Sequence, residues 1–225
     1  MKKQNSTMRT IVLASRKGGA GKTTLTGHLA VEATRTESGP VAVIDTDPQG
    51  SLTAWWNERQ AETPVFIDPA EFGGLMAALD QCRLNGIKLV IIDTPPQATE
   101  LIASVIAFAD LVVIPTQPSP HDLRAVGSTV QLAERSNKPT VFVVNGAAQR
   151  ARITADAAVA LSQHGAVAPI VIHQRTDFRT SMIDGRTVGE LDGSSRSAAE
   201  ISTLWAYILD RLNREKRNVA AAVTA

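Results

Sequence analysis

Apolar residues occur along the chain in short runs, separated by longer stretches of mixed polarity. Each run is continuous rather than alternating, which is typical of parallel strands that are covered on both faces of a sheet. The predicted buried strands are Thr10–Ala14, Val41–Ile44, Leu89–Ile92, Leu111–Ile114, Val141–Val144 and Ile170–Ile172, with Val65–Ile67 as a further short strand.

The stretches between these runs are rich in Ala, Leu and Glu, which favour helices. The predicted helices are Leu25–Thr36, Glu71–Asn85, Thr99–Phe108, His121–Ser136, Ala155–His164 and Ala198–Arg214. Strands that alternate with helices predict a doubly wound α/β fold, in which helices cover both faces of a mostly parallel sheet. Ligands of such folds bind at the carboxyl ends of the strands.

No internal repeat, low-complexity run or linker divides the chain. We therefore expect a single domain over residues 9–214, a disordered lead-in at 1–8 and a short tail at 215–225. The formal net charge is +1, so any basic binding surface must be local. The single cysteine, Cys82, excludes intrachain disulfides and iron–sulfur clusters held by several thiolates, and fits a reducing cytosol.

No apolar run approaches the ~18 residues of a membrane span. The polar start of the chain also lacks the apolar core of a signal peptide. These features predict a cytoplasmic protein.

A glycine-rich segment, Lys17–Thr24 (KGGAGKTT), lies between the first predicted strand and the first predicted helix. A strand, a glycine-rich turn and a helix form the context of a phosphate-binding loop. Glycines let backbone N–H groups converge on one point, and the helix N-terminus adds partial positive charge there. Lys22 is predicted to contact the β- and γ-phosphates, and the Thr23 hydroxyl to hold Mg²⁺.

The segment departs from the strict G-x-x-x-x-G-K-[ST] pattern because Arg16 and Lys17 precede the glycines. It resembles the deviant Walker A motif of the ParA/MinD family of ATPases. The resemblance implies a P-loop NTPase fold, ATP hydrolysis, and an ATP-bound homodimer in which Lys17 enters the partner's active site. The implied ATP-binding residues are Lys17, Gly18, Gly19, Ala20, Gly21, Lys22, Thr23 and Thr24, of which Lys17 and Lys22 are also catalytic. The alternative is a glycine-rich turn with two solvated lysines.

Two carboxylates, Asp45 and Asp47, follow the second predicted strand and are expected to project toward the phosphate site. The segment resembles the D-x-D-P-Q sequence of ParA proteins. The resemblance makes Asp47 catalytic, orienting the attacking water and the water ligands of Mg²⁺. Without that resemblance, Asp47-Pro48 is a common way to open a turn.

The run Leu89–Ile92 ends in Asp93, as a Walker B strand does. A carboxylate at the end of a buried strand is costly unless it has a partner, and Mg²⁺ supplies one. The following Thr94-Pro95-Pro96 resembles switch II of the family.

Two further segments follow predicted strands. Pro115–Pro120 is a stiff loop, and Ser119 or Asp122 is suited to start the next helix. Asn145 ends the run Val141–Val144; in the related family an Asn at this position helps to hold adenine, which makes Asn145 a candidate base contact. The alternative for Asn145 is a turn opener.

Basic residues between Gly146 and Arg217 are nine arginines and one lysine, against eight acids. The guanidinium fork matches phosphate geometry. The segments Arg175–Arg179 and Ser194–Glu200 resemble ParA segments that carry arginines for non-specific DNA binding, so Arg175, Arg179 and Arg196 are the predicted DNA contacts. The alternative is that these arginines form solvated ion pairs.

Together the motifs resemble a small ParA-type partitioning ATPase. The resemblance implies ATP and Mg²⁺ as cofactors, non-specific binding of double-stranded DNA by the homodimer, a ParB-like or ParG-like activator, and residence in the cytoplasm on the nucleoid, without a membrane. The rival hypotheses are a MinD-like membrane-cycling ATPase and a metabolic P-loop enzyme of the amidoligase type. A membrane anchor would distinguish the first rival, and a pocket for a small substrate the second.

Overall fold

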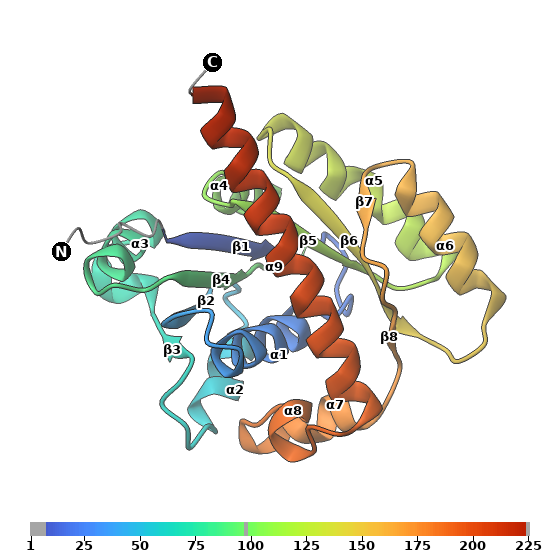
Figure 1. Cartoon of the computed structure of the whole chain (residues 1–225), viewed down its shortest axis with the longest axis horizontal. Helices are drawn as coiled ribbons and strands as arrows, with labels where there is room; N and C mark the ends of the chain where they lie inside the picture. The colour runs from blue at the N-terminus through green and yellow to red at the C-terminus, as the bar shows by residue number, and fades with distance from the viewer. Residues whose placement is uncertain (1–7, 97–98, 224–225) are drawn as a thin grey trace.

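A twisted sheet forms the centre of the computed structural model, which describes residues 8–96 and 99–223 (Figure 1). The strand order is β3-β2-β4-β1-β5-β6-β7, and β8 pairs with β6. Every pairing among the described strands is parallel, as the continuous apolar runs predict. The strands are β1 (Arg9–Leu13), β2 (Val41–Asp45), β3 (Val65–Phe66), β4 (Leu89–Asp93), β5 (Leu111–Thr116), β6 (Thr140–Ala147), β7 (Ala166–Val167) and β8 (Ile172–His173).

Helices cover both faces of the sheet, which confirms the predicted doubly wound α/β architecture. Figure 1 shows the long C-terminal helix α9 crossing one face beside α1. The helices are α1 (Lys22–Arg35), α2 (Ser51–Asn57), α3 (Leu75–Leu84), α4 (Thr99–Ile106), α5 (Pro120–Arg135), α6 (Arg152–Ser162), α7 (Asp177–Thr180), α8 (Val188–Leu191) and α9 (Arg196–Val223), with 3₁₀ turns η1 (Pro69–Phe72) and η2 (Ser181–Asp184).

Successive residues of each central strand enter different apolar cores. Ile11 and Leu13 of β1 face the core beneath α1, α2 and α9, whereas Val12 faces the core beneath α3, α4, α5 and α6. This alternation is the period of a strand, and burial on both faces explains why the apolar runs are continuous. The two cores fix the carboxyl ends of β1, β2, β4, β5 and β6 along one edge.

Predicted and observed elements differ in several places. The predicted helix Glu71–Asn85 is split into η1 and α3, because Gly73 and Gly74 interrupt it. The predicted strand Ile170–Ile172 is displaced to β8, and a short β7 precedes it. Helix α2 follows the Asp45–Gly50 turn and was not predicted from the sequence.

The predicted helix Ala198–Arg214 is longer in the structure, where α9 spans Arg196–Val223. An apolar stripe that includes Leu204, Ile208 and Leu212 buries the first part of this helix. Good helix formers and no Gly or Pro follow the stripe, so the sequence contains no local stop signal.

At the other end, the predicted lead-in at 1–8 falls outside the described residues except for Met8. The side chain of Met8 is partly buried against the core beneath α3 to α6. Across residues 8–96 and 99–223, the structure contains no helix with the length and apolarity needed to cross a membrane.

Candidate nucleotide site

The glycine-rich loop joins β1 to α1 at the carboxyl edge of the sheet. Gly19 and Gly21 have φ angles of 75° and 93°, a region in which only glycine is unstrained. Gly21 occupies the N-cap position of α1, and no side chain of the described residues caps this helix. The first-turn amides are therefore available to an anion, with the helix dipole behind them.

Two amide side chains from neighbouring strands fasten this loop to the sheet. Gln117, after β5, donates to the Gly19 carbonyl at 2.9 Å, and Asn145 on β6 donates to the Ala20 carbonyl at 2.7 Å. Gln117 was not singled out from the sequence. Asn145, the predicted base contact, thus holds the loop directly, and the rest of its side chain lines the hollow described below.

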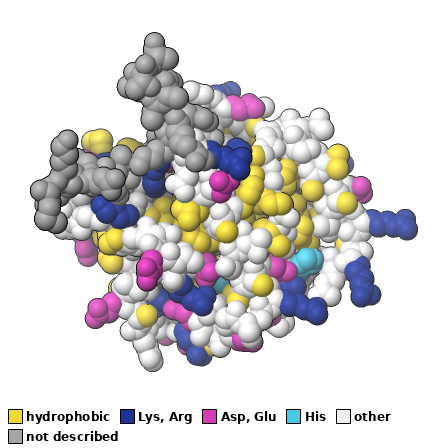
Figure 2. Space-filling view, in the orientation of Figure 1, with side chains coloured by type: hydrophobic (Ala, Val, Ile, Leu, Met, Phe, Trp, Pro, Cys, Tyr) yellow, Lys and Arg dark blue, Asp and Glu magenta, His cyan; other side chains and the backbone are white. Residues whose placement is uncertain are grey.

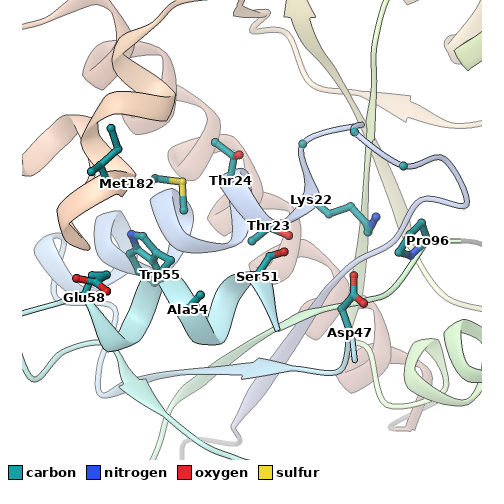
Figure 3. Close-up of a pocket in the computed structure, with 14 residues that line it drawn as sticks. Lys22, Thr23, Thr24, Asp47, Ser51, Ala54, Trp55, Glu58, Pro96 and Met182 are labelled. Atoms are coloured by element: carbon teal, nitrogen blue, oxygen red, sulfur yellow. The ribbon is translucent and has the colours of Figure 1, made fainter. Parts of the chain in front are cut away.

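Lys22, the first residue of α1, is buried at the floor of a pocket of about 620 Å³. Figure 3 shows Lys22, Asp47 and Pro96 at one end of this pocket, and Trp55, Glu58 and Met182 at the other. Burial lowers the pKa of the Lys22 ammonium, and the negative charges of Asp93 and Asp47 oppose that change. The predicted phosphate lysine is therefore inside the pocket beside two acids.

Asp93 ends β4 with a fully buried carboxylate. The Thr23 hydroxyl donates to Asp93 Oδ2 at 2.5 Å, and the Thr94 amide donates to Oδ1 at 3.1 Å. Burial raises the pKa of Asp93 to about 7, although the Thr23 hydrogen bond and the Lys22 charge lower it. This site fits Mg²⁺, because hard oxygen donors adjoin the phosphate loop and a cation would favour the ionised form of Asp93.

Asp45, which ends β2, and Asp47, which follows it, have different positions, contrary to the expectation that both face the phosphate site. Asp45 Oδ2 accepts hydrogen bonds at 3.0 Å from the amides of Leu52 and Thr53, so this carboxylate stabilises the start of α2. Asp45 Oδ1 accepts from the amide of Asp47 at 3.0 Å. Asp47 alone lines the nucleotide pocket, as its predicted catalytic role requires.

Threonines next to these acids join the neighbouring strands, a function that the sequence did not reveal. Thr46 donates through its hydroxyl to the Asp93 carbonyl at 2.6 Å, and Thr94 donates to the Leu13 carbonyl at 2.8 Å. The ends of β2, β4 and β1 are thereby linked across the site. A threonine directly after each acid, in Asp45-Thr46 and Asp93-Thr94, was the available signal.

Lys17 has a different position from Lys22. Its ammonium pairs with Asp122 in the first turn of α5, and Ser119 donates to the same carboxylate. The Asp122 side chain is 3% exposed and that of Lys17 is 36% exposed. Ser119 also caps α5 by accepting from the Asp122 amide at 3.1 Å, as predicted. Lys17 is not among the residues that line the pocket, whereas Gly18, Gly19, Gly21, Thr23 and Thr24 are.

A second hollow, of about 190 Å³, adjoins the opposite side of the loop and shares Gly19, Gly21 and Thr24 with the first. Asn145, Arg175 and Arg179 line it. Glu200 of α9 accepts from Arg175 at 2.6 Å and from the His173 ring at 2.7 Å. The hydrogen bonds from Arg175 and His173 outweigh burial, so the pKa of Glu200 is lowered.

The three predicted DNA-binding arginines therefore have different surroundings. Arg175 forms an ion pair with Glu200, and its side chain is 16% exposed, so this pair is more buried than the solvated ion pairs of the alternative. Arg179 is exposed at the rim of the second hollow. Arg196 is exposed at the first residue of α9. DNA contact by these residues stays a prediction.

Comparison with known proteins agrees with this geometry. The sequence pattern of the CobQ/CobB/MinD/ParA nucleotide binding domain matches residues 11–188, which include the glycine-rich loop, Asp47, Asp93 and Asn145. The chain belongs to this family. It is therefore a nucleotide-binding ATPase of ParA/MinD type, as the motifs predict.

Several proteins are similar to this ATPase along their sequences. Maintenance of carboxysome distribution protein A from Halothiobacillus neapolitanus is 28% identical over 200 residues, which are 85% of this chain and 91% of that protein. Protein ParA from Rhizobium radiobacter is 32% identical over 126 residues, or 56% of each chain. The chromosome-partitioning ATPase Soj from Thermus thermophilus is 30% identical over 155 residues, which are 56% of this chain and 62% of that protein.

Solved structures share the fold of this ATPase at lower identity. A McdA–ATP complex from Cyanothece has a TM-score of 0.71 and 19% identity, covering 92% of this chain and 97% of that one. MinD from Pyrococcus horikoshii in complex with Mg-ADP has a TM-score of 0.73 and 15% identity, covering 90% and 96%.

Proposed function

We propose that this protein is a positioning ATPase of ParA type, which segregates a plasmid, a chromosome or a protein assembly. Mg-ATP bridges two copies of the chain, and the dimer binds double-stranded DNA without sequence preference. Hydrolysis of ATP then releases the protein from the DNA. A ParB-like or ParG-like partner stimulates that hydrolysis, and the protein works in the cytoplasm on the nucleoid. The names of the relatives ParA, Soj and carboxysome distribution protein A support this class of cargo movement.

The observation that carries the proposal is the separation of the two loop lysines. Lys22 is buried in the nucleotide pocket, whereas the Lys17 ammonium lies outside it on Asp122. The half-exposed Lys17 side chain is therefore accessible to a second copy of the chain. A trans role for Lys17 accounts for a second lysine in a loop whose own phosphate site already contains one.

Different residues of the nucleotide pocket have different roles in ATP hydrolysis. The first-turn amides of α1 and Lys22 bind and orient the phosphates, and Thr23 with Asp93 would hold Mg²⁺, which neutralises phosphate charge when bound. Asp47, which also lines this pocket, would orient the attacking water. Lys22 is the only Lys, Arg or His among the described residues that line this pocket, so we expect slow turnover in the absence of a partner that stabilises the transition state.

The trans role is tested with Lys17→Gln and with Lys138→Gln near the start of β6, at the opposite end of the sheet. Both variants should bind ATP like the wild type in calorimetry. Only Lys17→Gln should fail to form an ATP-dependent dimer in light scattering and fail to release phosphate. Normal dimerisation and turnover by Lys17→Gln would refute the proposed arrangement.

A locally basic edge supports the DNA step. Figure 2 shows Lys and Arg side chains gathered along the lower right of the face in view, the part of the molecule where Figure 1 places β8 and the β6–α6 connection. Arg196 adds an exposed guanidinium at the start of α9. A dimer would present two such weak patches, and counterion release would drive their binding to any duplex.

The DNA step is tested with Arg196→Ala and, as a matched control, Arg83→Ala on α3, where Arg83 pairs with Asp80. Binding to two unrelated duplexes is measured with ATP across a salt series. Arg196→Ala should weaken both complexes alike and reduce the log–log salt slope by about one, and Arg83→Ala should change neither. An unchanged slope for Arg196→Ala would place the DNA surface elsewhere, and ATP-dependent binding to liposomes instead of DNA would favour the MinD-like alternative.

A further inference from the structure

A groove of about 380 Å³ adjoins the nucleotide pocket, and Asp47 lines both. One wall is the Asp45–Pro48 segment, the second is the chain from Asp68 to Leu75, and the third is α4. We call this hollow the acidic groove. It is separate from the hollow that contains Asn145.

The floor and one wall of the acidic groove are apolar. Leu101, Val105 and Phe108 lie four and three residues apart, so they share one face of α4 and its C-terminal extension. Leu101 is 39% exposed and Phe108 is only partly buried, although both are large apolar side chains. Leu75 faces them from the start of α3. Exposed apolar side chains that gather in a hollow mark a contact surface.

The rim of the same groove is negatively charged. Asp45, Asp47 and Asp68 contribute carboxylates, and no Lys, Arg or His is among the described residues that line it. The Asp45 carboxylate accepts hydrogen bonds from the backbone of α2. Asp68 is exposed, and within the described part of the chain its hydrogen bond is to the Ala70 amide, through Oδ1 at 2.8 Å. A cationic group that enters the groove therefore meets complementary charge beside an apolar floor.

We propose that the acidic groove binds a short segment of a partner protein in which a basic side chain stands next to an apolar one. The size of the groove suits a few side chains of a peptide, since small-ligand pockets occupy about 300–1,000 Å³. The negative charge of the rim favours a basic segment over an acidic one.

The position of the groove gives its occupant access to the hydrolytic site. Asp47 forms part of one wall, and α4, on another wall, is the first helix after Asp93. An occupant thus contacts Asp47 itself and the helix that follows the strand ending in Asp93. The inference rests on the proposed function for its purpose, because it assigns the docking site of the activating partner.

The test is a selection of short random peptides on the wild-type chain, followed by affinity measurements by fluorescence anisotropy on groove variants. Leu101→Glu places a charge on the apolar wall. Asp68→Asn removes a rim charge but retains an N-cap, since Asn caps helices as well as Asp does. The matched controls are Val159→Glu and Asp156→Asn on α6, where both residues are exposed.

Selected peptides should combine Arg or Lys with Leu, Ile or Phe. They should lose about tenfold in affinity on Leu101→Glu and about threefold or more on Asp68→Asn, as expected for an apolar anchor and a rim charge. The two controls should bind them like the wild type. Selected peptides that lack basic residues, that bind the groove variants unchanged, or that do not emerge at all would overturn the proposal.

ATP hydrolysis and ATP-dependent dimerisation of the wild-type chain are measured separately. Their absence would refute the proposed function without altering the peptide result. Conversely, an active, dimerising ATPase whose selected peptides ignore Leu101 and Asp68 would retain the proposed function and refute the acidic groove as a docking site.

Discussion

His28 on α1 provides a prediction whose magnitude follows from the structure. Its ring is 1% exposed, donates through Nδ1 to the Thr24 carbonyl at 2.8 Å, and meets the Phe178 ring edge-on at a centroid distance of 5.3 Å. Nε2 lies 3.4 Å from the Ser181 hydroxyl. Burial lowers the pKa of His28 from 6.5 to about 4, and the Thr24 hydrogen bond and the Glu190 charge offset only part of that effect.

The sign follows from the proton balance. Between pH 6.5 and about 4 the unfolded chain binds a proton at His28 that the folded protein does not, so the free energy of unfolding falls as the pH falls. At 1.36 kcal/mol for each pKa unit, the full effect is about 3 kcal/mol. Between pH 8 and pH 5 the expected loss from His28 is about 2 kcal/mol.

The measurement is urea unfolding of the wild type and of His28→Leu at several pH values, followed by tryptophan fluorescence. Carboxylates titrate in both proteins, so the difference between the two free energies at each pH isolates His28. The free energy of unfolding of the wild type minus that of His28→Leu should fall by about 2 kcal/mol from pH 8 to pH 5. Parallel slopes for the wild type and His28→Leu would refute the assignment of a neutral, buried His28.

Three further predictions concern the nucleotide site. Lys22→Ala should abolish ATP binding in calorimetry, because it removes the buried charge that balances the phosphates; affinity like that of the wild type would contradict the role of the loop. Asp47→Ala should bind Mg-ATP but release no phosphate, leaving a long-lived dimer in light scattering, since a water-orienting group acts mainly in the transition state; equal losses of affinity and turnover would make Asp47 structural. Asp45→Ala should lower the stability by about 1–3 kcal/mol in urea unfolding, because the amides that start α2 lose their acceptor, whereas an unchanged midpoint would show that other groups satisfy those amides.

The features that the sequence predicts well depend on local patterns. Continuous apolar runs identify the five central strands, and glycines next to Lys22 identify the phosphate loop, because burial on two faces and a backbone turn each require a specific local composition. Asp93 could be predicted for a similar reason, since a lone acid at the end of an apolar strand requires a partner.

The features that the sequence misses depend on residues far apart in the chain. The Lys17–Asp122 pair joins positions 105 residues apart, and Glu200 meets Arg175 across 25 residues. Such contacts decide whether an arginine can bind DNA or is already paired with an acid. The periodicity of the sequence does not predict them. Helix α2 was missed because its stabilising carboxylate belongs to the preceding strand.

The hydrogen bonds of Glu200 have a thermodynamic consequence. They join the wall of the second hollow, at His173 and Arg175, to the first turn of α9, four residues after Arg196. Ser197 adds a second connection by donating to Asp177 at 2.6 Å. A ligand that displaces the wall must therefore also displace the start of the helix or break buried, charge-assisted bonds. If a ligand of the hollow changes the affinity for a second ligand at the start of α9 in this way, reciprocity requires the second ligand to change the affinity of the hollow by the same factor.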